Sequence, residues 1–214
     1  MKPNHHFPSR YFTALLVCVA MAVLSACATL FPPHIPRVLL VVPQSQIADV
    51  EYEKPRAALD AMGAQVSVAT VTLDEASGKT LRIKPDLTID NAKAEDYDAI
   101  AVIGGWGTMY QLWDHAGLHA LLRDADQQDR IVAAICAGPI ALAHAGLLKG
   151  RNATSSPDVK KGDQTQRKEM VSHGALYRDD MLVVVDGHFI TANGPQSSSE
   201  FGDTLVKQLQ ARIN

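Results

Sequence analysis

The chain of 214 residues has few cysteines, no cluster of charges of one sign and no long apolar run. Three cysteines are too few for a disulfide framework. The net charge of −3, without a run of Lys or Arg, argues against nucleic acid as a partner. No apolar stretch approaches the about 20 residues of a typical membrane-spanning helix. With 47% hydrophobic and 20% charged residues, the composition is that of one globular domain with a sizeable core.

The first 27 residues have the layout of an export signal. Lys2 and Arg10 supply positive charge, residues 14–24 form an apolar stretch of 11 residues, and small residues precede Cys27. Leu24-Ser-Ala-Cys27 also resembles the lipobox of bacterial lipoproteins, which implies cleavage before Cys27 and a lipid on its sulfur. An uncleaved anchor and plain secretion stay open as alternatives. We expect a protein of the cell envelope, lipid-anchored to a membrane, with its domain outside the cytoplasm.

The sequence thus divides into three predicted parts. Residues 1–27 are the signal, residues 28–36 form a tether in which three prolines prevent regular pairing, and residues 37–214 form the domain. The cysteine inside the apolar stretch would leave with the signal, and the next cysteine would carry the lipid. Cys136 would then be the single thiol of the folded domain, without an intramolecular disulfide partner.

Continuously apolar segments alternate with amphipathic ones along the domain. Strands are expected at residues 38–42, 64–70, 98–103, 131–135, 182–185 and 189–192, with a short extra strand at 81–83; helices are expected at 46–62, 139–148 and 199–213, and an amphipathic region at 104–128. This alternation predicts an α/β fold with a parallel sheet and helices on both of its faces.

Cys136 lies where a buried strand becomes a helix. The strand Ile131–Ile135 ends directly before it, and Gly138-Pro139 opens an Ala- and Leu-rich helix after it. Unpaired amides and the dipole at a helix N-terminus stabilise a thiolate, so we expect the pKa of Cys136 to fall below about 7. The alternative is a small, inert, buried cysteine.

Three segments are expected to converge at the carboxyl ends of the parallel strands, where ligands bind in such sheets. They are residues 43–51, the glycine-containing turn at 104–107, and Cys136-Ala137. Taken alone, the glycine pair at 104–105 could equally be a plain tight turn. Their convergence favours a binding or catalytic site over an inert cysteine.

Several motifs together resemble the ThiJ/PfpI superfamily, the class I glutamine amidotransferase-like group that includes the Parkinson-linked deglycase. They are Val102-Ile-Gly-Gly105, Ala133-Ala-Ile-Cys-Ala-Gly-Pro139, Ala145-Gly-Leu-Leu-Lys-Gly150 and Asp186-Gly-His-Phe-Ile-Thr191, followed by Gly194-Pro195 and Glu200-Phe201. The resemblance runs from about residue 37 to the C-terminus. It implies a flavodoxin-like three-layer α/β/α sandwich with a mostly parallel central sheet.

The resemblance also implies roles for four residues. Cys136 matches the nucleophile on the family's strained elbow, and the amides of Gly105 and Ala137 match its oxyanion hole, where each donor contributes about 3 kcal/mol. Glu51 lies where the family's acidic partner of the cysteine is expected, and beside a thiolate it would hold its proton. Asp49 and Glu53 are nearby alternatives, and a solvated helix face is the third possibility for all three carboxylates.

The sequence departs from the family at three positions that often carry histidine. Ala137 follows the cysteine, Ser156 replaces the histidine of a Thr-Thr-His-Pro-like segment, and Trp106 stands within the glycine turn. General acid/base chemistry at neutral pH usually needs a histidine or a tuned carboxylate, so a complete hydrolytic triad is not expected.

The remaining histidines and aromatic residues give weaker signals. His115 and His119 are spaced i,i+4 without a nearby carboxylate or cysteine, so no metal site is expected. His144 is expected to be packed or solvated, and His173 and His188 have no assigned role. Trp106, Tyr110 and Trp113 are expected either at a pocket mouth or subunit contact or in the core.

Two hypotheses follow from these residues. The first is a cysteine-dependent hydrolase, glyoxalase or deglycase that acts on small carbonyl compounds without a cofactor. The second is a non-enzymatic module, either an oxidation sensor through Cys136 or a binder of small ligands. The retained elbow, glycines and Glu51 favour the first hypothesis, and the missing histidines favour the second. The resemblance also makes a homodimer a candidate assembly.

Overall fold

The computed structural model describes residues 34–156, 160–161 and 164–213. The chain divides into two units at residues 34 and 35, and the unit from Ile35 onward contains the fold described below. The predicted signal, the lipidation residue Cys27 and most of the predicted tether lie outside the described residues. Within the described part of the chain, no helix has the length and apolar character needed to cross a bilayer.

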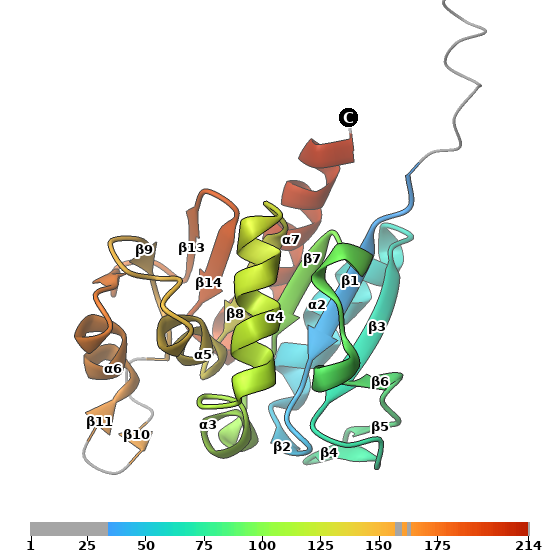
Figure 1. The fold of residues 1–214 in the computed structure, drawn as a ribbon, viewed down its shortest axis with the longest axis horizontal. Helices are drawn as coiled ribbons and strands as arrows, with labels where there is room; N and C mark the ends of the chain where they lie inside the picture. The colour runs from blue at the N-terminus through green and yellow to red at the C-terminus, as the bar shows by residue number, and fades with distance from the viewer. Residues whose placement is uncertain (1–33, 157–159, 162–163, 214) are drawn as a thin grey trace, which may run out of the picture. The chain divides into compact units, whose positions relative to one another are not determined.

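A mostly parallel seven-stranded sheet forms the centre of the described domain (Figure 1). Its spatial order is β13-β14-β8-β7-β1-β3-β6, and the one antiparallel pair is the hairpin of β13 and β14 at one edge. The strands are β1 (Arg37–Val41), β3 (Gln65–Thr70), β6 (Leu87–Thr88), β7 (Ala99–Val102), β8 (Ile131–Ile135), β13 (Val183–Asp186) and β14 (Phe189–Ala192). The predicted parallel sheet is confirmed, with strand bounds within one or two residues of those expected.

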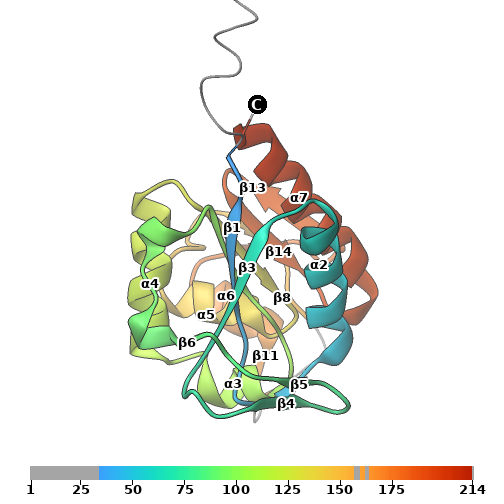
Figure 2. The ribbon, with the colours of Figure 1, turned by 90° about the vertical axis from the view of Figure 1, so that its right-hand side faces the viewer.

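Helices cover both faces of the sheet, which gives the expected three layers (Figure 2). On one face lie α2 (Asp49–Ala61) and α7 (Ser198–Ile213), which pack against each other. On the other face lie α4 (Ala116–Gln127) and α5 (Gly138–His144), with α3 (Trp106–Gln111) near the carboxyl ends of the strands. The flavodoxin-like α/β/α sandwich is therefore confirmed.

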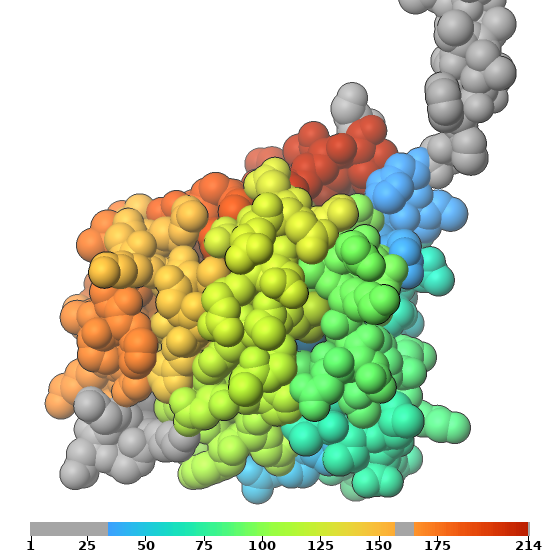
Figure 3. Space-filling model, viewed as in Figure 1, coloured from blue at the N-terminus to red at the C-terminus, as the bar shows by residue number. Residues whose placement is uncertain are grey.

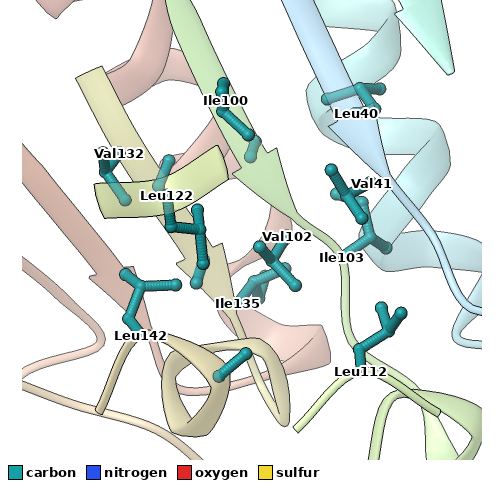
Figure 4. Close-up of a cluster of buried hydrophobic side chains, with 14 of the residues drawn as sticks. Leu40, Val41, Ile100, Val102, Ile103, Leu112, Leu122, Val132, Ile135 and Leu142 are labelled. Carbon is teal, nitrogen blue, oxygen red and sulfur yellow. The ribbon is translucent and has the colours of Figure 1, made fainter. Parts of the chain in front are cut away.

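The central strands are apolar throughout because both of their faces are covered. All five residues of β8 and all four of β7 are buried. Figure 4 shows Ile100, Val132 and Ile135 of the sheet region close to Leu122 of α4 and Leu142 of α5. Burial of each such side chain contributes about 1.5–3 kcal/mol, so this layer fixes the junction at which Cys136 lies.

Two predicted helices begin or end elsewhere than expected. The helix expected from residue 46 begins at Asp49, because Gln46 has a φ of 57° and Ile47 bridges to Gly105. The helix expected to reach residue 148 ends at His144, because Gly146 has a φ of 82°, the left-handed conformation that terminates helices.

Several short elements were not expected, including the helix α6 (Gln166–Ser172). Its polar composition gives little periodic signal, and its N-cap Thr165, whose hydroxyl accepts from the Lys168 amide, is the local cue. The short extra strand expected at residues 81–83 is present as β5 (Arg82–Ile83). The remaining short elements are β2 (Ser45–Ile47), β4 (Ala76–Gly78), β9 (Asn152–Ala153), β10 (Lys160–Lys161), β11 (Gln164–Thr165), β12 (Leu176–Tyr177), η1 (Ile89–Asn91), η2 (Ala94–Asp96) and η3 (Pro195–Ser197).

Candidate active site

Cys136 occupies a strained turn between β8 and α5. Its φ of 59° lies in the left-handed region, which costs a non-glycine residue about 1–2 kcal/mol. Hydrogen bonds hold the turn on both sides: the Cys136 amide donates to the Ala192 carbonyl at 2.9 Å, and its carbonyl accepts from the Ser156 amide at 3.2 Å. The side chain is buried but not sealed, with 8% of its surface exposed. The turn is therefore a sharp elbow that directs the Cys136 side chain away from the sheet ladder and leaves its sulfur partly accessible.

Two backbone amides, those of Gly105 and Ala137, interact with the Cys136 sulfur and favour its ionised form. Gly105 reaches this position with a φ of 122°, which a residue with a side chain rarely adopts. A Cβ at this position would also lie 2.7 Å from the Ala48 nitrogen. The structure therefore brings together the two amides that were predicted to form an oxyanion hole.

Glu51 lies in the first turn of α2 and is completely buried beside Cys136. Among the described residues, neither of its carboxyl oxygens has a hydrogen-bond partner of ordinary geometry. Burial raises the pKa of Glu51 to about 7, and the interaction with the Cys136 thiol opposes this rise. The carboxyl group is therefore poised to exchange a proton near neutral pH.

The structure separates Glu51 from its two sequence neighbours. The Asp49 carboxylate accepts hydrogen bonds from the Lys79 and Thr80 amides at 2.9 and 2.7 Å, so it anchors the loop after β4. Glu53 is exposed on the helix surface. Of these three carboxylates, Glu51 alone faces the thiol.

Gly104 makes the contact between Glu51 and Cys136 possible. A Cβ on Gly104 would lie 2.6 Å from the Cys136 Cβ and would also meet a Glu51 oxygen. The glycine pair at 104–105 is therefore more than a tight turn, because each glycine leaves room for a different part of the site.

The predicted low pKa of Cys136 is not supported by the structure. Burial raises the pKa of the Cys136 thiol, and the negative charge of ionised Glu51 raises it further, against the lowering effect of the two amides. The position at a helix N-terminus favours the thiolate, but the removal of the sulfur from water acts in the opposite direction and is the larger effect. The thiol and the carboxyl titrate as a coupled pair, and once Glu51 has lost its proton the thiol resists ionisation.

A cavity of about 190 Å³ opens onto this pair. It is lined by Ala48, Glu51, Gly105, Trp106, Cys136, Ala137, Ser156 and Pro195. A neighbouring hollow of about 390 Å³, which includes Lys79, shares Ala48, Gly105 and Trp106 with it. A molecule bound at the sulfur could thus extend past Trp106 into a second, more polar compartment.

Comparison with known proteins identifies the family. The DJ-1/PfpI family model matches residues 36–208. The chain belongs to the DJ-1/PfpI family. It is 33% identical over 175 residues to an uncharacterized protein of Methanocaldococcus jannaschii, which covers 81% of this chain and 82% of that protein. It is also 30% identical over 152 residues to Drosophila melanogaster dj-1beta, which covers 70% and 77% of the two chains.

Solved structures of the DJ-1/PfpI group share the fold. A ThiJ/PfpI domain protein from Brachyspira murdochii superimposes with a TM-score of 0.76 at 26% identity, over 83% of this chain and 98% of the other. Drosophila melanogaster DJ-1beta superimposes with a TM-score of 0.72 at 26% identity, over 82% and 91% of the two chains. The family resemblance read from the sequence motifs is confirmed.

The departures from the DJ-1/PfpI family pattern lie at the cavity itself. Ala137, Ser156 and Trp106, the three residues that the sequence resemblance predicted in place of histidines, all line it, and no histidine is among its lining residues in the described chain. Trp106 is 56% exposed at the mouth, whereas Trp113 is in the core and donates from Nε1 to the Ala137 carbonyl at 2.7 Å. Tyr110 is exposed away from this lining. Glu51 is the titratable group nearest the thiol.

The two histidines spaced i,i+4 do not form a pair of ligands. His115 caps α4 by accepting from the Leu118 amide at 3.1 Å, and His119 Nε2 lies 2.7 Å from the Trp113 carbonyl oxygen. His188 contacts Asp126 and Asp129, and it is distant from Cys136 in the sequence. His144 and His173 lie instead in a polar cluster, which is described below.

Proposed function

We propose that this DJ-1/PfpI family protein is a cysteine-dependent enzyme that acts on small carbonyl compounds, with chemistry of the glyoxalase or deglycase type. The observation that carries the proposal is the buried Glu51 carboxyl beside the Cys136 thiol, with the Gly105 and Ala137 amides at the same sulfur. These groups supply a nucleophile, a proton acceptor and two donors for a developing oxyanion.

The proposed reaction begins with transfer of the thiol proton. Ionised Glu51 accepts this proton as the Cys136 sulfur bonds to the aldehyde carbon of a 1,2-dicarbonyl, and the carbonyl oxygen becomes an oxyanion at the two amides. Protonated Glu51 then neutralises that oxygen. A pKa of about 7 leaves Glu51 able both to take and to return a proton at neutral pH.

The carbon skeleton is then converted internally, without an external oxidant. Glu51 removes the proton from the carbon bonded to sulfur, and the neighbouring carbonyl oxygen takes up the hydroxyl proton of the first carbon, which gives an enediolate. Glu51 then returns its proton to the second carbon. The first carbon becomes the thioester carbonyl and is oxidised, and the second becomes a hydroxyl-bearing carbon and is reduced. The resulting thioester is hydrolysed by water, which releases a 2-hydroxy acid and restores the thiol. The balance is one dicarbonyl and one water consumed for each 2-hydroxy acid.

The size of the cavity supports a small substrate. A volume of about 190 Å³ is below the roughly 300–1,000 Å³ that is typical of sites for drug-sized ligands. Its walls are mostly small or apolar side chains, and they would restrict water around the sulfur. A dicarbonyl with a few carbon atoms fits this space, whereas a larger adduct would have to reach into the hollow beyond Trp106.

The test is turnover of glyoxal and methylglyoxal by the purified chain, measured as formation of the 2-hydroxy acid. We expect turnover by the wild type and none above the buffer rate for Cys136→Ala, because the variant has no sulfur to form the covalent intermediate. Retained turnover in Cys136→Ala would overturn the proposal. Circular dichroism and thermal unfolding of the variant would show that the loss is not one of folding.

Oxidation sensing is the second candidate, favoured by the absence of histidine among the described lining residues. A sulfenate or sulfinate at Cys136 would be stabilised by the same two amides and by a protonated Glu51. If the wild type shows no dicarbonyl turnover, peroxide titration followed by mass spectrometry would decide. Selective oxidation at Cys136 would support the sensor, and its absence would favour a ligand-binding module.

We also propose that the protein is anchored to a membrane of the cell envelope through Cys27. The support is the sequence alone: positive charge, an apolar stretch of 11 residues, and Leu24-Ser-Ala-Cys27. Mass spectrometry of the native N-terminus should find a chain that begins at Cys27 with acyl groups attached, since more than one acyl chain is needed for stable anchoring. An intact Met1 or an unmodified Cys27 would contradict the proposal.

A further inference from the structure

A cluster of histidines and carboxylates lies outside the cysteine cavity, where three segments of the chain meet. Asp114 comes from the loop before α4, His144 ends α5, and Glu169 and His173 belong to α6 and its C-cap. In Figure 3 the segments around α5 and α6, coloured gold to orange, lie together at the surface beside α4. The proposed enzyme chemistry uses none of these residues.

His144 is held between two carboxylates. Its Nδ1 lies 2.7 Å from an Asp114 oxygen, and its Nε2 lies 2.9 Å from a Glu169 oxygen. A neutral imidazole has one N–H and can donate to only one of them. With Nδ1 donating to Asp114, the lone pair of Nε2 faces the Glu169 oxygen. A cation coordinated by both of these atoms satisfies the contact, as a second ring proton would.

A second imidazole converges on the same carboxylate. The His173 ring stacks on the His144 ring with centroids 4.5 Å apart, and its Nδ1 lies 3.7 Å from the same Glu169 oxygen. The stack brings two imidazole rings to one carboxylate, and one metal ion could accept a lone pair from each of the three groups. Nδ1 of the exposed His173 also approaches the Glu169 carbonyl oxygen at 3.0 Å and the Ser172 hydroxyl at 3.3 Å, so metal binding would replace these two contacts.

We propose that His144, Glu169 and His173 form a site for a divalent transition metal ion of the zinc class. One ligand atom from each residue lies within 4.8 Å of the others. A tetrahedral zinc ion with bonds of about 2.0–2.1 Å needs ligand atoms about 3.3 Å apart, and the observed 2.9 and 3.7 Å lie on either side of that value.

The surroundings of the cluster fit this proposal. A carboxylate on the far nitrogen of a metal-bound histidine is a usual supporting contact, and Asp114 makes it with His144. Two imidazoles and one carboxylate favour zinc-class ions over magnesium or calcium, which prefer oxygen ligands alone. Side-chain exposures of 14%, 18% and 37% for the three ligands leave a path for the ion and a fourth position for water.

The test is titration of the metal-free full chain with Co²⁺ and Zn²⁺. We expect one Co²⁺ per chain, bound with the visible absorption of a four- or five-coordinate site, displaced by Zn²⁺, and accompanied by a rise in Tm. His144→Ala, Glu169→Gln and the exposed His173→Ala should each weaken binding at least about tenfold, and Asp114→Asn about tenfold. Thermal unfolding without metal would show which variants remain folded.

His188→Ala is the matched control. His188 also lies between two carboxylates, at 2.8 Å from Asp126 and 3.2 Å from Asp129, but belongs to no metal-ligating group in the described chain. The His188→Ala variant should bind metal as the wild type does. Any metal binding by His5 and His6 is the same in all variants. Failure of the wild type to bind, binding unchanged in folded His173→Ala, or a thiolate-to-cobalt band from Cys136 would overturn the proposal. None of these results depends on dicarbonyl turnover.

Discussion

Glu51→Gln is expected to turn over small dicarbonyls about 10²-fold more slowly than the wild type. Glutamine keeps the shape of the side chain and an N–H donor but cannot accept a proton. In the proposed mechanism Glu51 takes the thiol proton and then moves the proton between the two carbonyl carbons. The loss should appear in kcat, measured as formation of the 2-hydroxy acid.

The same variant should make the thiol easier to ionise. The charge of Glu51 raises the pKa of Cys136, and Glu51→Gln removes that charge while the Gly105 and Ala137 amides remain. Iodoacetamide labelling of Cys136 at pH 8 to 9 should therefore be about tenfold faster or more in the variant, which corresponds to a pKa decrease of about one unit. A more reactive thiol with slower turnover would assign proton transfer to Glu51.

Glu53→Gln is the control for both measurements, because Glu53 is exposed two residues further along the same helix. It should leave turnover and labelling as they are in the wild type. Unchanged turnover in Glu51→Gln would remove Glu51 from the mechanism. Slower labelling in Glu51→Gln would contradict the expected increase, and it would mean that protonated Glu51 stabilises the thiolate.

The second large effect is a pH dependence of stability. Folding raises the pKa of Glu51 from 4.5 to about 7, so the folded chain binds more protons than the unfolded chain between these values. Stability from this group is complete below about pH 4.5 and is lost as pH rises through 7. The shift corresponds to about 3 kcal/mol, taking about 1.4 kcal/mol for each pKa unit.

Urea unfolding from pH 4.5 to 8 would measure this dependence. The free energy of unfolding of Glu51→Gln, relative to the wild type, should rise by about 3 kcal/mol over this range, because the variant has no carboxyl to ionise in the buried site. Glu53→Gln should follow the wild type throughout. A parallel pH dependence in Glu51→Gln would contradict the burial of an ionisable group at this position.

The sequence predicted the strands and the place of Cys136 because both depend on local patterns. β7 and β8 are continuously apolar, which is typical of strands covered on both faces, and this pattern alone located them within two residues. Gly138-Pro139 after β8 placed Cys136 at a strand-to-helix junction. The helix bounds were less predictable, because α2 begins only after Gln46 and Ile47 have made contacts with a distant turn.

The residues that form the site were partly predictable from the sequence in the same way. Family motifs indicated Gly105, Ala137 and Cys136, and the structure places the amides of Gly105 and Ala137 at the Cys136 sulfur. The choice of Glu51 over Asp49 and Glu53 was not decided by helix periodicity. The tertiary contacts decided it: Asp49 is bonded to the loop after β4, Glu53 is exposed, and Glu51 is buried against Gly104 and Cys136.

The sequence by itself determined the layers of the fold, the elbow and the family, because short apolar runs and glycine positions specify backbone conformation locally. The tertiary structure alone decided the charge state of the site and the contacts among distant polar groups. The direction of the Cys136 pKa depends on how completely the sulfur leaves water and on the carboxylate that burial places beside it. Likewise, the contacts of His144 with Asp114 and Glu169 join residues 30 and 25 positions away, because packing of α5 against α6 and the Asp114 loop sets distances that no local pattern records.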